Sequence, residues 1–531
     1  MMKNPILPGF YPDPTICRKG EWYYIANSTF QWWPGIPIHR SRDLRHWEFA
    51  GHALTQTSQA DLSRTSDSSG IWAPDLTWDG NTFWLCFTIV SKQQERVPFT
   101  ANYCMTAEAV TGPWSEPVYL HSMGYDHSMF HAPDGRKYVV SMHVDDTPGA
   151  RTSFAGITLQ EYDPGEKRLA GRPEEIFKGT ELDVTEGPHM YYRNRWYYLL
   201  TAEGGTLYGH AVTCARSREL YGPYDVRPGN PILTAAGRET LLQKTGHADM
   251  IEVTPERWAM VYLAARPVDR KCMLGRETCI QSIIWKGDWP WLEHDGPSED
   301  VPDFGIAEYS MSQPEARDDF DTAEIRPGWL TPRVPAGSWL DLYSRPGWLR
   351  LHSLPTVLCN VEPVSFLARR IQHHAFRAET LMEFTPESTY QHAGLVCYYD
   401  TTHWYFLSKH RNSQKEMVVS VRVYDLNEQR YATVGEAKLY DESCPIRLAV
   451  ESDGRSFKFL CAGLEEEWRE ICAPRDALIL SDDYIFRKVF AFTGAFVGIA
   501  AWDRRGLKAQ ADFDYFEYRC ENTIDNEGVT C

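Results

Sequence analysis

The 531-residue chain lacks several features that would place it in common protein classes. No run of apolar residues is long enough to span a bilayer, and residues 1–14 contain neither the apolar segment nor the cleavage site of a signal peptide. Basic residues are outnumbered by acidic ones, which gives a formal net charge of −18. This charge argues against nucleic acid and anionic membranes as partners, and it suits an enzyme that acts on neutral ligands.

Paired cysteine motifs are also lacking, although the chain contains 13 cysteines. No two of them form a C-x-x-C motif, which weakens a zinc or redox hypothesis. Several lie in apolar segments such as "FWLCFTIV" and "AGLVCYYD", where a thiol behaves as a small hydrophobic group. We therefore expect reduced thiols and a cytoplasmic protein.

Long helical patterns are scarce, whereas short aromatic and β-branched runs bounded by turn residues are frequent. One motif, a turn residue followed by an aromatic-rich strand, occurs five times, at 20–28, 80–89, 135–143, 193–204 and 255–264. Its copies recur every 55 to 62 residues. Because this period fits a blade of four strands, the sequence predicts a five-bladed β-propeller over residues 1–305.

The remainder of the chain has a different pattern. Residues 306–325 fall in a segment rich in Pro, Asp and Glu, which indicates a linker. Alternating runs such as "WLRLHSL" and "EMVVSVRVYDL" follow it and predict an antiparallel β-sandwich over residues 326–531. The expected fold class is therefore all-β, with a propeller followed by a sandwich.

An acidic residue precedes each aromatic strand by 8 to 12 positions; the five are Asp13, Asp75, Asp126, Glu186 and Asp249. A single acid between two prolines, such as Asp13, most often marks a rigid turn, and the residue before Pro14 is expected to be extended. Five acids in register instead favour a cluster at the central channel. Crowded carboxylates raise each other's pKa, so that one can stay protonated while another is ionised, as glycoside hydrolysis requires.

The motifs that contain these acids resemble those of glycoside hydrolase family 43, most closely its β-xylosidases. The resemblance rests on "NPILPGFYPDPTI", "GIWAPDL", "YDHSMF", "VTEGPHMYY", "GHADM" and "LGRET". The second half is similar to the concanavalin-like jelly roll of those enzymes, notably in "FTGAFVGIAAWD" and "ADFDYFEYR". The resemblance implies an exo-acting, inverting β-1,4-xylosidase that releases xylose from the non-reducing end of xylo-oligosaccharides.

The same resemblance assigns roles to individual residues. Asp13 would be the general base, Glu186 the general acid, and Asp126 the residue that orients Glu186 and tunes its pKa. An inverting enzyme needs room for a water molecule, so the carboxyl groups of Asp13 and Glu186 should stand roughly 6.5–9.5 Å apart. Asp75 and Asp249 are expected to hold the channel together rather than to act in catalysis.

Further residues are implied as substrate contacts: Arg276 for sugar hydroxyls, Trp72 as a pocket wall, Phe30 with Trp32 and Trp33 at the rim, His247 in the channel, and Phe492 or Phe496 of the sandwich as a closing group. Core packing explains Trp72 equally well, and an ordinary buried histidine is an equal interpretation of His247. No cofactor is required, although a structural or activating Ca²⁺ near His247 would fit the resemblance. A homodimer or homotetramer is also implied.

Three alternatives stay open at this point. An α-L-arabinofuranosidase, or an enzyme with both activities, would use the same kind of pocket. A non-catalytic carbohydrate-binding protein could have the same fold, but it would not need an acid–base pair. A protein-interaction platform of the WD or kelch kind is disfavoured, because those repeats run roughly 40–50 residues and carry their own signatures.

Overall fold

The computed structural model describes residues 2–92, 98–150, 153–309, 315–439, 441–442 and 444–521. The chain forms two compact units. The first consists of Met1–Ala60, Ser68–Pro267 and Arg276–Met311, and the second of Asp61–Asp67, Val268–Gly275 and Ser312–Cys531. Part of the expected linker 306–325, namely residues 310–314, lies outside the described residues.

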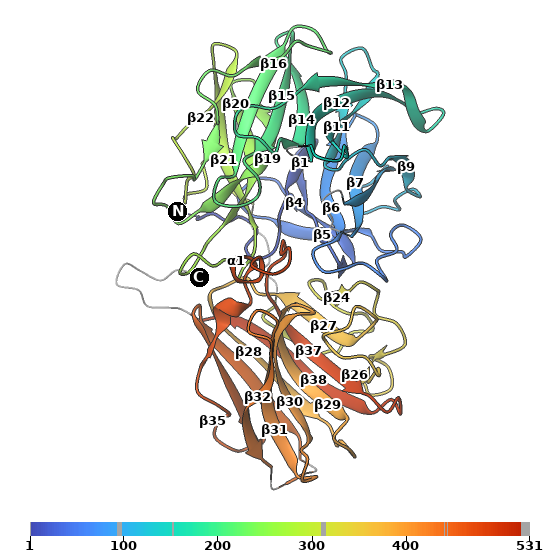
Figure 1. The fold of residues 1–531 in the computed structure, drawn as a ribbon, viewed down its shortest axis with the longest axis vertical. Coiled ribbons are helices and arrows are strands. Elements are labelled where there is room, and N and C mark those ends of the chain that lie inside the picture. Colours follow the sequence, from blue (N-terminus) through green and yellow to red (C-terminus); the bar gives the residue numbers. More distant parts are fainter. Residues whose placement is uncertain are drawn as a thin grey trace. The chain divides into compact units, whose positions relative to one another are not determined.

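The first unit contains five antiparallel sheets that follow one another along the chain (Figure 1). The first sheet consists of β1 (Thr15–Lys19), β2 (Trp22–Ala26), β4 (Gly35–Ser41) and β5 (Glu48–Leu54). The second consists of β6 (Gly70–Trp78), β7 (Phe83–Lys92), β8 (Phe99–Ala107) and β9 (Val118–His121). The third consists of β10 (His127–His131), β11 (Lys137–Val144), β12 (Phe154–Asp163) and β13 (Arg168–Phe177).

The last two sheets repeat this order. The fourth consists of β14 (Glu186–Arg193), β15 (Trp196–Glu203), β16 (Ala211–Ser217) and β17 (Asp225–Val226), with β18 (Leu233–Thr234) also paired to β16. The fifth consists of β19 (Gln243–Thr254), β20 (Arg257–Ala265), β21 (Glu277–Lys286) and β22 (Trp289–Leu292). Along the chain, a short strand, β3 (Trp32–Trp33), comes after β2 and before β4. This is the five-bladed propeller that the sequence predicts, because the described residues form one sheet per repeat.

The repeated aromatic motif forms the second strand of every blade, namely β2, β7, β11, β15 and β20. Its rings fill the space between sheets: Tyr138, Tyr198 and Tyr262 are fully buried. The first strands of successive blades pack against one another, which makes them the innermost strands. Side chains at the start of these first strands therefore meet at the centre of the ring.

The N-terminal segment joins the first blade to the last. Leu7 exchanges two backbone hydrogen bonds with Thr278 of β21. The Asn4 side chain donates to the carbonyls of Ile280 and Ser298, and it accepts from the Ile280 amide at 2.9 Å. These bonds close the ring of blades a few residues before Asp13.

The second unit is a sandwich of two antiparallel sheets (Figure 1). The larger sheet contains β25 (Leu340–Asp341), β26 (Leu349–His352), β38 (Gln510–Cys520), β28 (Ala375–Glu383), β33 (Ile446–Asp453), β34 (Ser456–Ala462) and β35 (Arg469–Glu470), with β23 (Arg317–Asp318) and β36 (Arg475–Asp476) at its sides. The smaller sheet contains β27 (Ser365–Arg370), β37 (Phe496–Asp503), β29 (Gln391–Asp400), β30 (His403–Arg411), β31 (Met417–Asp425) and β32 (Arg430–Lys438).

The core of the sandwich follows the alternation of its strands. In β29 and β31, Leu395 and Val421 are buried among core residues contributed by both sheets, as the period-two pattern of the sequence predicts. The unit also contains β24 (Thr331–Pro332), a 3₁₀ turn (Ala477–Ile479) and the short helix α1 (Asp482–Ile485). No helix in the described ranges is both long and apolar enough to cross a membrane. The all-β fold class is thus confirmed.

Candidate active site

Asp13 lies two residues before β1, with a side chain that is only 5% exposed. The expectation that it is extended is wrong: its φ angle is +50°, in the left-handed region that L-residues other than Asn and Asp rarely adopt. A short carboxylate side chain tolerates this conformation better than most. The two flanking prolines therefore enclose a tight turn and not a straight segment. This turn sets the direction of the Asp13 carboxylate.

Three polar groups hold this carboxylate. Ser28 donates a hydrogen bond to Oδ2 of Asp13 at 2.5 Å, and Arg276 forms an ion pair with Oδ1 at 2.9 Å. Nδ1 of His247 lies 3.7 Å from the same Oδ1. Burial acts to raise the pKa of Asp13, but the charge of Arg276, the charge of His247 when it is protonated, and the Ser28 hydrogen bond outweigh it, so the pKa falls below its ordinary value. Asp13 is therefore ionised at neutral pH, as a general base must be.

Arg276 and His247 differ in charge. Arg276 also donates to Oγ1 of Thr206 at 3.2 Å, and its guanidinium lies 5.5 Å from the centre of the Phe30 ring. Burial, more than any neighbouring charge, lowers the pKa of His247 to about 4. At neutral pH the cation beside Asp13 is thus Arg276, while His247 is a neutral hydrogen-bonding group.

Glu186 is the first residue of β14 and is half-buried. Tyr125 donates a hydrogen bond to its Oε2 at 3.3 Å. Burial and then the negative charge of Asp13 raise the pKa of Glu186 to about 7, against the opposing effects of Tyr125 and Arg276. A carboxyl group with this pKa can keep its proton near neutral pH and deliver it to a leaving group.

Asp126 is the residue just before β10; it is buried, and its φ angle is +51°. It accepts a hydrogen bond from the backbone amide of Gly187, the residue after Glu186. Burial, Glu186 and Asp13 together raise the pKa of Asp126 well above its ordinary value. The third predicted carboxyl therefore interacts with both others, and it is fixed to the strand that carries Glu186.

A series of aromatic rings, which includes Trp72 of β6, lies next to the carboxyl cluster. The ring centre of Trp72 lies 5.3 Å from that of Tyr125 and 6.0 Å from that of Phe30, whose ring in turn lies 5.8 Å from Phe10. The Trp72 indole donates to a backbone carbonyl, at Ser68, and the side chain is half-buried. Phe30 and Trp72 are thus brought to the carboxyl cluster. Their role as a sugar wall stays a prediction, as does the rim role of the buried Trp32 and Trp33.

Four residues near the carboxyl cluster were not predicted from the sequence. Tyr125 adjoins Asp126 in the chain, so its proximity to the site could have been inferred. Ser28 and Thr206 follow aromatic strands without any fixed offset, and their contacts with Asp13 and Arg276 depend on folding across many residues. The fourth, His210, is a buried neutral imidazole with a pKa lowered to about 3, chiefly by burial, and no repeat marked it.

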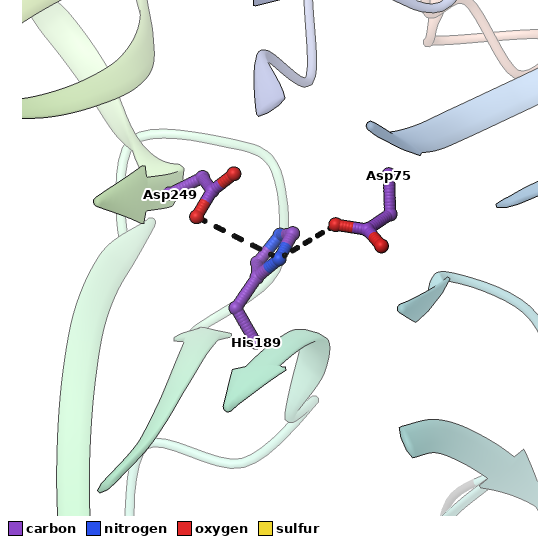
Figure 2. Close-up of side chains that lie close together, drawn as sticks. All are labelled: Asp75, His189 and Asp249. Carbon is purple, nitrogen blue, oxygen red and sulfur yellow. Dashed lines mark ion pairs between the residues drawn. The ribbon is translucent and has the colours of Figure 1, made fainter. Parts of the chain in front are cut away.

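The two remaining predicted acids form a separate group around His189 (Figure 2). Nδ1 of His189 lies 3.3 Å from Oδ1 of Asp75 and 3.8 Å from Oδ1 of Asp249. Burial acts to lower the pKa of His189, but Asp249 and Asp75 outweigh it, so the pKa is raised. The five acids therefore divide into a catalytic-type cluster of three and an ion-paired cluster of two.

The geometry of Asp75, His189 and Asp249 would allow a metal ion, because their donor atoms lie within 4.8 Å of one another. The oxygens of Asp249, however, already accept four hydrogen bonds. Ca²⁺ prefers six to eight oxygen ligands, and a neutral imidazole is a poor substitute. The donor set therefore suits a protonated His189 better than Ca²⁺. The other group of possible metal ligands among the described residues is Cys272, Asp482 and Asp483. His247, beside which the resemblance implied calcium, belongs to neither group.

Phe492 and Phe496 belong to the second unit. Phe496 opens β37 and is fully buried beside Tyr398. Phe492 is half-buried and stacks on Phe490, with ring centres 5.9 Å apart. Closure of a sugar pocket by either ring stays a prediction.

Comparison with known proteins gives consistent results over the whole chain. The family model "Glycosyl hydrolases family 43" matches residues 2–290, and "Beta xylosidase C-terminal Concanavalin A-like domain" matches residues 317–519. The chain is 43% identical to a xylosidase/arabinosidase 43B of Humicola insolens (98% of this chain, 97% of the relative) and 39% identical to a β-xylosidase of Bacillus subtilis (97% and 99%). A crystal structure of a xylan β-1,4-xylosidase from Bacillus halodurans superposes with a TM-score of 0.94 at 40% identity, covering 98% of this chain and all of that one.

Proposed function

Because the chain belongs to glycosyl hydrolases family 43, we propose that it is an inverting, exo-acting β-1,4-xylosidase that releases xylose from the non-reducing end of xylo-oligosaccharides. It is a glycoside hydrolase of the β-xylosidase type; the linkage, the mode of attack and the stereochemistry are the proposal. The observation that supports it best is the opposite shift in pKa of Asp13 and Glu186 within one buried group.

The chemistry follows from these two protonation states. Glu186 donates its proton to the glycosidic oxygen as the bond from that oxygen to the anomeric carbon breaks. Asp13 accepts a proton from a water molecule, whose oxygen forms the new bond to the anomeric carbon on the opposite face. One turnover leaves Asp13 protonated and Glu186 ionised, and both return to their starting states by proton exchange with solvent.

The neighbouring groups act on these two residues. Arg276 holds Oδ1 of Asp13 at 2.9 Å and so keeps the base ionised and oriented. Burial and the negative charge of Asp13 favour the protonated form of Glu186. The separation of roughly 6.5–9.5 Å between the Asp13 and Glu186 carboxyl groups stays a prediction of the inverting mechanism.

α-L-Arabinofuranosidase activity is a second candidate, alone or beside the xylosidase activity. The Humicola insolens relative is named for both sugars, and a 31% identical Bacteroides ovatus relative is named a non-reducing end α-L-arabinofuranosidase. A Vibrio relative, 38% identical, is named a xylan 1,3-β-xylosidase, so the linkage also needs a test. Specificity is therefore an experimental question about one and the same site.

The decisive experiment uses several substrates and one stereochemical measurement. Rates should be compared on the 4-nitrophenyl derivatives of β-D-xylopyranose and α-L-arabinofuranose, and on β-1,3- and β-1,4-xylobiose. Proton NMR during the first turnovers should show α-xylose as the initial product of a β-xyloside. Initial β-xylose would refute inversion, and a higher kcat/KM on the arabinofuranoside would replace the first candidate by the second.

A variant of the general acid separates an enzyme from a carbohydrate-binding protein. In Glu186→Gln, kcat on xylobiose should fall by about 10²–10⁴-fold, with a much smaller loss on a substrate whose leaving group needs no proton. Glu174→Gln, an exposed residue of β13, provides the matched control. Equal losses on both substrates would contradict the role of Glu186 as the acid, and no turnover in the wild-type protein would favour a binding function.

A further inference from the structure

A pocket of about 590 Å³ is lined by residues of the sandwich. Its lining includes His392 of β29, Arg422 and Tyr424 of β31, and Trp502 of β37. These positions alternate along their strands with residues of the sandwich core, so they lie on the face of the six-stranded sheet that points away from the core. The pocket is therefore distinct from the carboxyl cluster of the propeller, and the proposed hydrolysis does not use it.

The remaining walls come from three connecting segments. Cys359 and Asn360 belong to the segment between β26 and β27, Tyr390 precedes β29, and Arg504 follows β37. Tyr431 of β32 completes the pocket. A volume of this size accommodates one or two sugar units, since small-ligand pockets run from about 300 to 1,000 Å³.

Of the described residues that line this pocket, two are arginines and none carries a carboxylate. Several other arginines of the sandwich form ion pairs: Arg350, for example, forms two hydrogen bonds with Asp512. Among the residues that the structure describes, neither Arg422 nor Arg504 forms an ion pair with a carboxylate. Arg422 is half-buried; its side chain hydrogen-bonds with Tyr431, and the charge of Glu436 acts on it from beyond ion-pair distance. The pocket thus presents two guanidinium groups without an ion-paired carboxylate in the described ranges, in a chain whose net charge is −18.

Aromatic and neutral polar groups make up the rest of the lining. Tyr390 and Tyr431 are 54% and 61% exposed, and the Tyr424 and Tyr431 rings meet at 89° with centres 5.9 Å apart. Exposed tyrosine rings combine an apolar face with a hydroxyl, which suits the C–H and O–H groups of a sugar. The side chain of Asn360 accepts a bond from the Val357 amide through its oxygen, which leaves the amide nitrogen available as a donor. His392 is neutral, because burial lowers its pKa, so the charge of the pocket comes from the arginines.

From this combination we infer that the sandwich pocket binds an anionic sugar unit, with its carboxylate or phosphate on Arg422 and Arg504 and its ring against the tyrosines. Guanidinium groups recognise both kinds of oxyanion through paired N–H donors. A uronic acid residue and a sugar phosphate share this chemistry. The site would retain or sense acidic carbohydrate and goes beyond the hydrolytic function proposed above.

Cys359 provides a direct test, because it is exposed and lines the pocket. Its alkylation by N-ethylmaleimide can be followed by peptide mass spectrometry, with the exposed Cys444 as an internal control. D-Glucuronate or glucose 6-phosphate at about ten times its dissociation constant should slow the alkylation of Cys359 about tenfold and leave Cys444 unchanged. Glucuronate alone would identify a carboxylate ligand, and glucose 6-phosphate alone a phosphate ligand.

Neutral D-glucose and two charge variants complete the experiment. Glucose should give at least about tenfold weaker protection, since it lacks the anion that a charge-assisted bond requires. The double variant Arg422→Gln/Arg504→Gln should lose protection by either anion, whereas Arg519→Gln, which removes an exposed charge of β38, should keep it. Hydrolysis of the aryl xyloside should be unchanged in both. Equal protection by glucose, no protection by either anion, or full protection in the double variant would each overturn the inference.

Discussion

Asp13 and Glu186 carry the same functional group, yet their surroundings shift the two pKa values in opposite directions. Both are removed from water, which by itself raises the pKa of each. Asp13 overcomes this effect because Arg276 and Ser28 contact its two oxygens directly. Among the residues that the structure describes, the Glu186 carboxyl accepts a hydrogen bond from the Tyr125 phenol, and the charge of Asp13 acts on it. The difference in pKa between the proposed base and the proposed acid therefore depends on two direct contacts of Asp13, one with the Arg276 cation and one with the Ser28 hydroxyl.

The first prediction concerns the pH dependence of catalysis. Glu186 must be protonated to act, and its pKa is about 7, so kcat/KM should fall tenfold per pH unit above about pH 7. Asp13 must be ionised, and its pKa lies below the ordinary value, so the acid limb should appear only below about pH 4. Initial rates on an aryl xyloside between pH 3 and 10 measure both limbs. A rate that stays constant up to pH 9 would contradict the assignment of Glu186.

The second prediction concerns Ser28. Its hydrogen bond lowers the pKa of Asp13, so Ser28→Ala should raise that pKa and move the acid limb of kcat/KM toward higher pH. Loss of the bond should also loosen the base and reduce kcat by about tenfold or more, because small misplacements cost much of the rate. A full pH–rate profile separates the two effects. Ser413→Ala, an exposed residue of the sandwich, should leave the profile unchanged.

The third prediction links Glu186 to stability. A carboxyl group whose folded pKa is raised stabilises the fold most below its unfolded pKa of about 4.5, and this contribution is lost as pH rises through 7. Glu186→Gln removes the buried charge, so the variant should gain up to about 3 kcal/mol relative to wild type at pH 8.5 and little at pH 4.5. Denaturant unfolding at the two pH values measures the difference. An equal effect at both would show that Glu186 is not held protonated by its surroundings.

At the scale of elements, the irregular start of β19 is important for the site. The pairing of β19 with β20 shifts register on both sides of Gly246, and the next residue, His247, has a φ angle of +45°. A Cβ atom on Gly246 would lie 2.4 Å from the His210 ring. This bulge therefore lets two imidazoles and the strand share one small volume beside Asp13.

Substitution of Gly246 tests that role. Gly246→Ala should displace His210 or His247, reduce kcat/KM at least about tenfold and destabilise the first unit by about 1–3 kcal/mol, as expected for overpacking of a filled interior. Gly337→Ala is the control, because no atom lies within 4 Å of its Cβ position. Steady-state kinetics and thermal unfolding measure both effects. Wild-type activity in Gly246→Ala would mean that the imidazoles can move without consequence.

The elements were largely predictable from the sequence, and the contacts within the site were not. Each aromatic segment predicted a strand, such as β11, because a run of aromatic and β-branched residues between two turns has few other conformations. The acids at the start of β10 and β14 followed from the same repeat. The φ angle of Asp13 could not be predicted. A residue that precedes a proline usually has an extended backbone, but the packing of this turn overrides that preference. The Ser28 hydrogen bond depends on side-chain geometry that no spacing encodes.

At the scale of the whole molecule, the closure of the propeller depends on Asn4. Its side chain takes part in three hydrogen bonds with the last blade and the segment after it. Asn4→Ala would leave a buried amide and two carbonyls without these partners, so we expect a loss of about 2–4 kcal/mol. Calorimetry should show the loss in the first unit, and kcat/KM should fall because Asp13 follows closely in the chain.

A matched asparagine makes this test specific. Asn81 lies in an exposed turn of the second blade, where its side chain contacts only the neighbouring Thr82. Asn81→Ala should change the unfolding free energy by less than about 0.5 kcal/mol, as is usual for surface substitutions. If both variants behave alike, closure of the ring does not depend on Asn4.

The pairing of the N-terminal segment with β21 also has a consequence for biosynthesis. Asp13 leaves the ribosome 263 residues before Arg276, the cation that pairs with it. Until then the nascent chain carries the proposed base without its cation, and the segment around Leu7 without the strand that pairs with it. Hydrolytic competence should therefore arise in a single late step of translation, when the fifth blade emerges, rather than accumulate blade by blade.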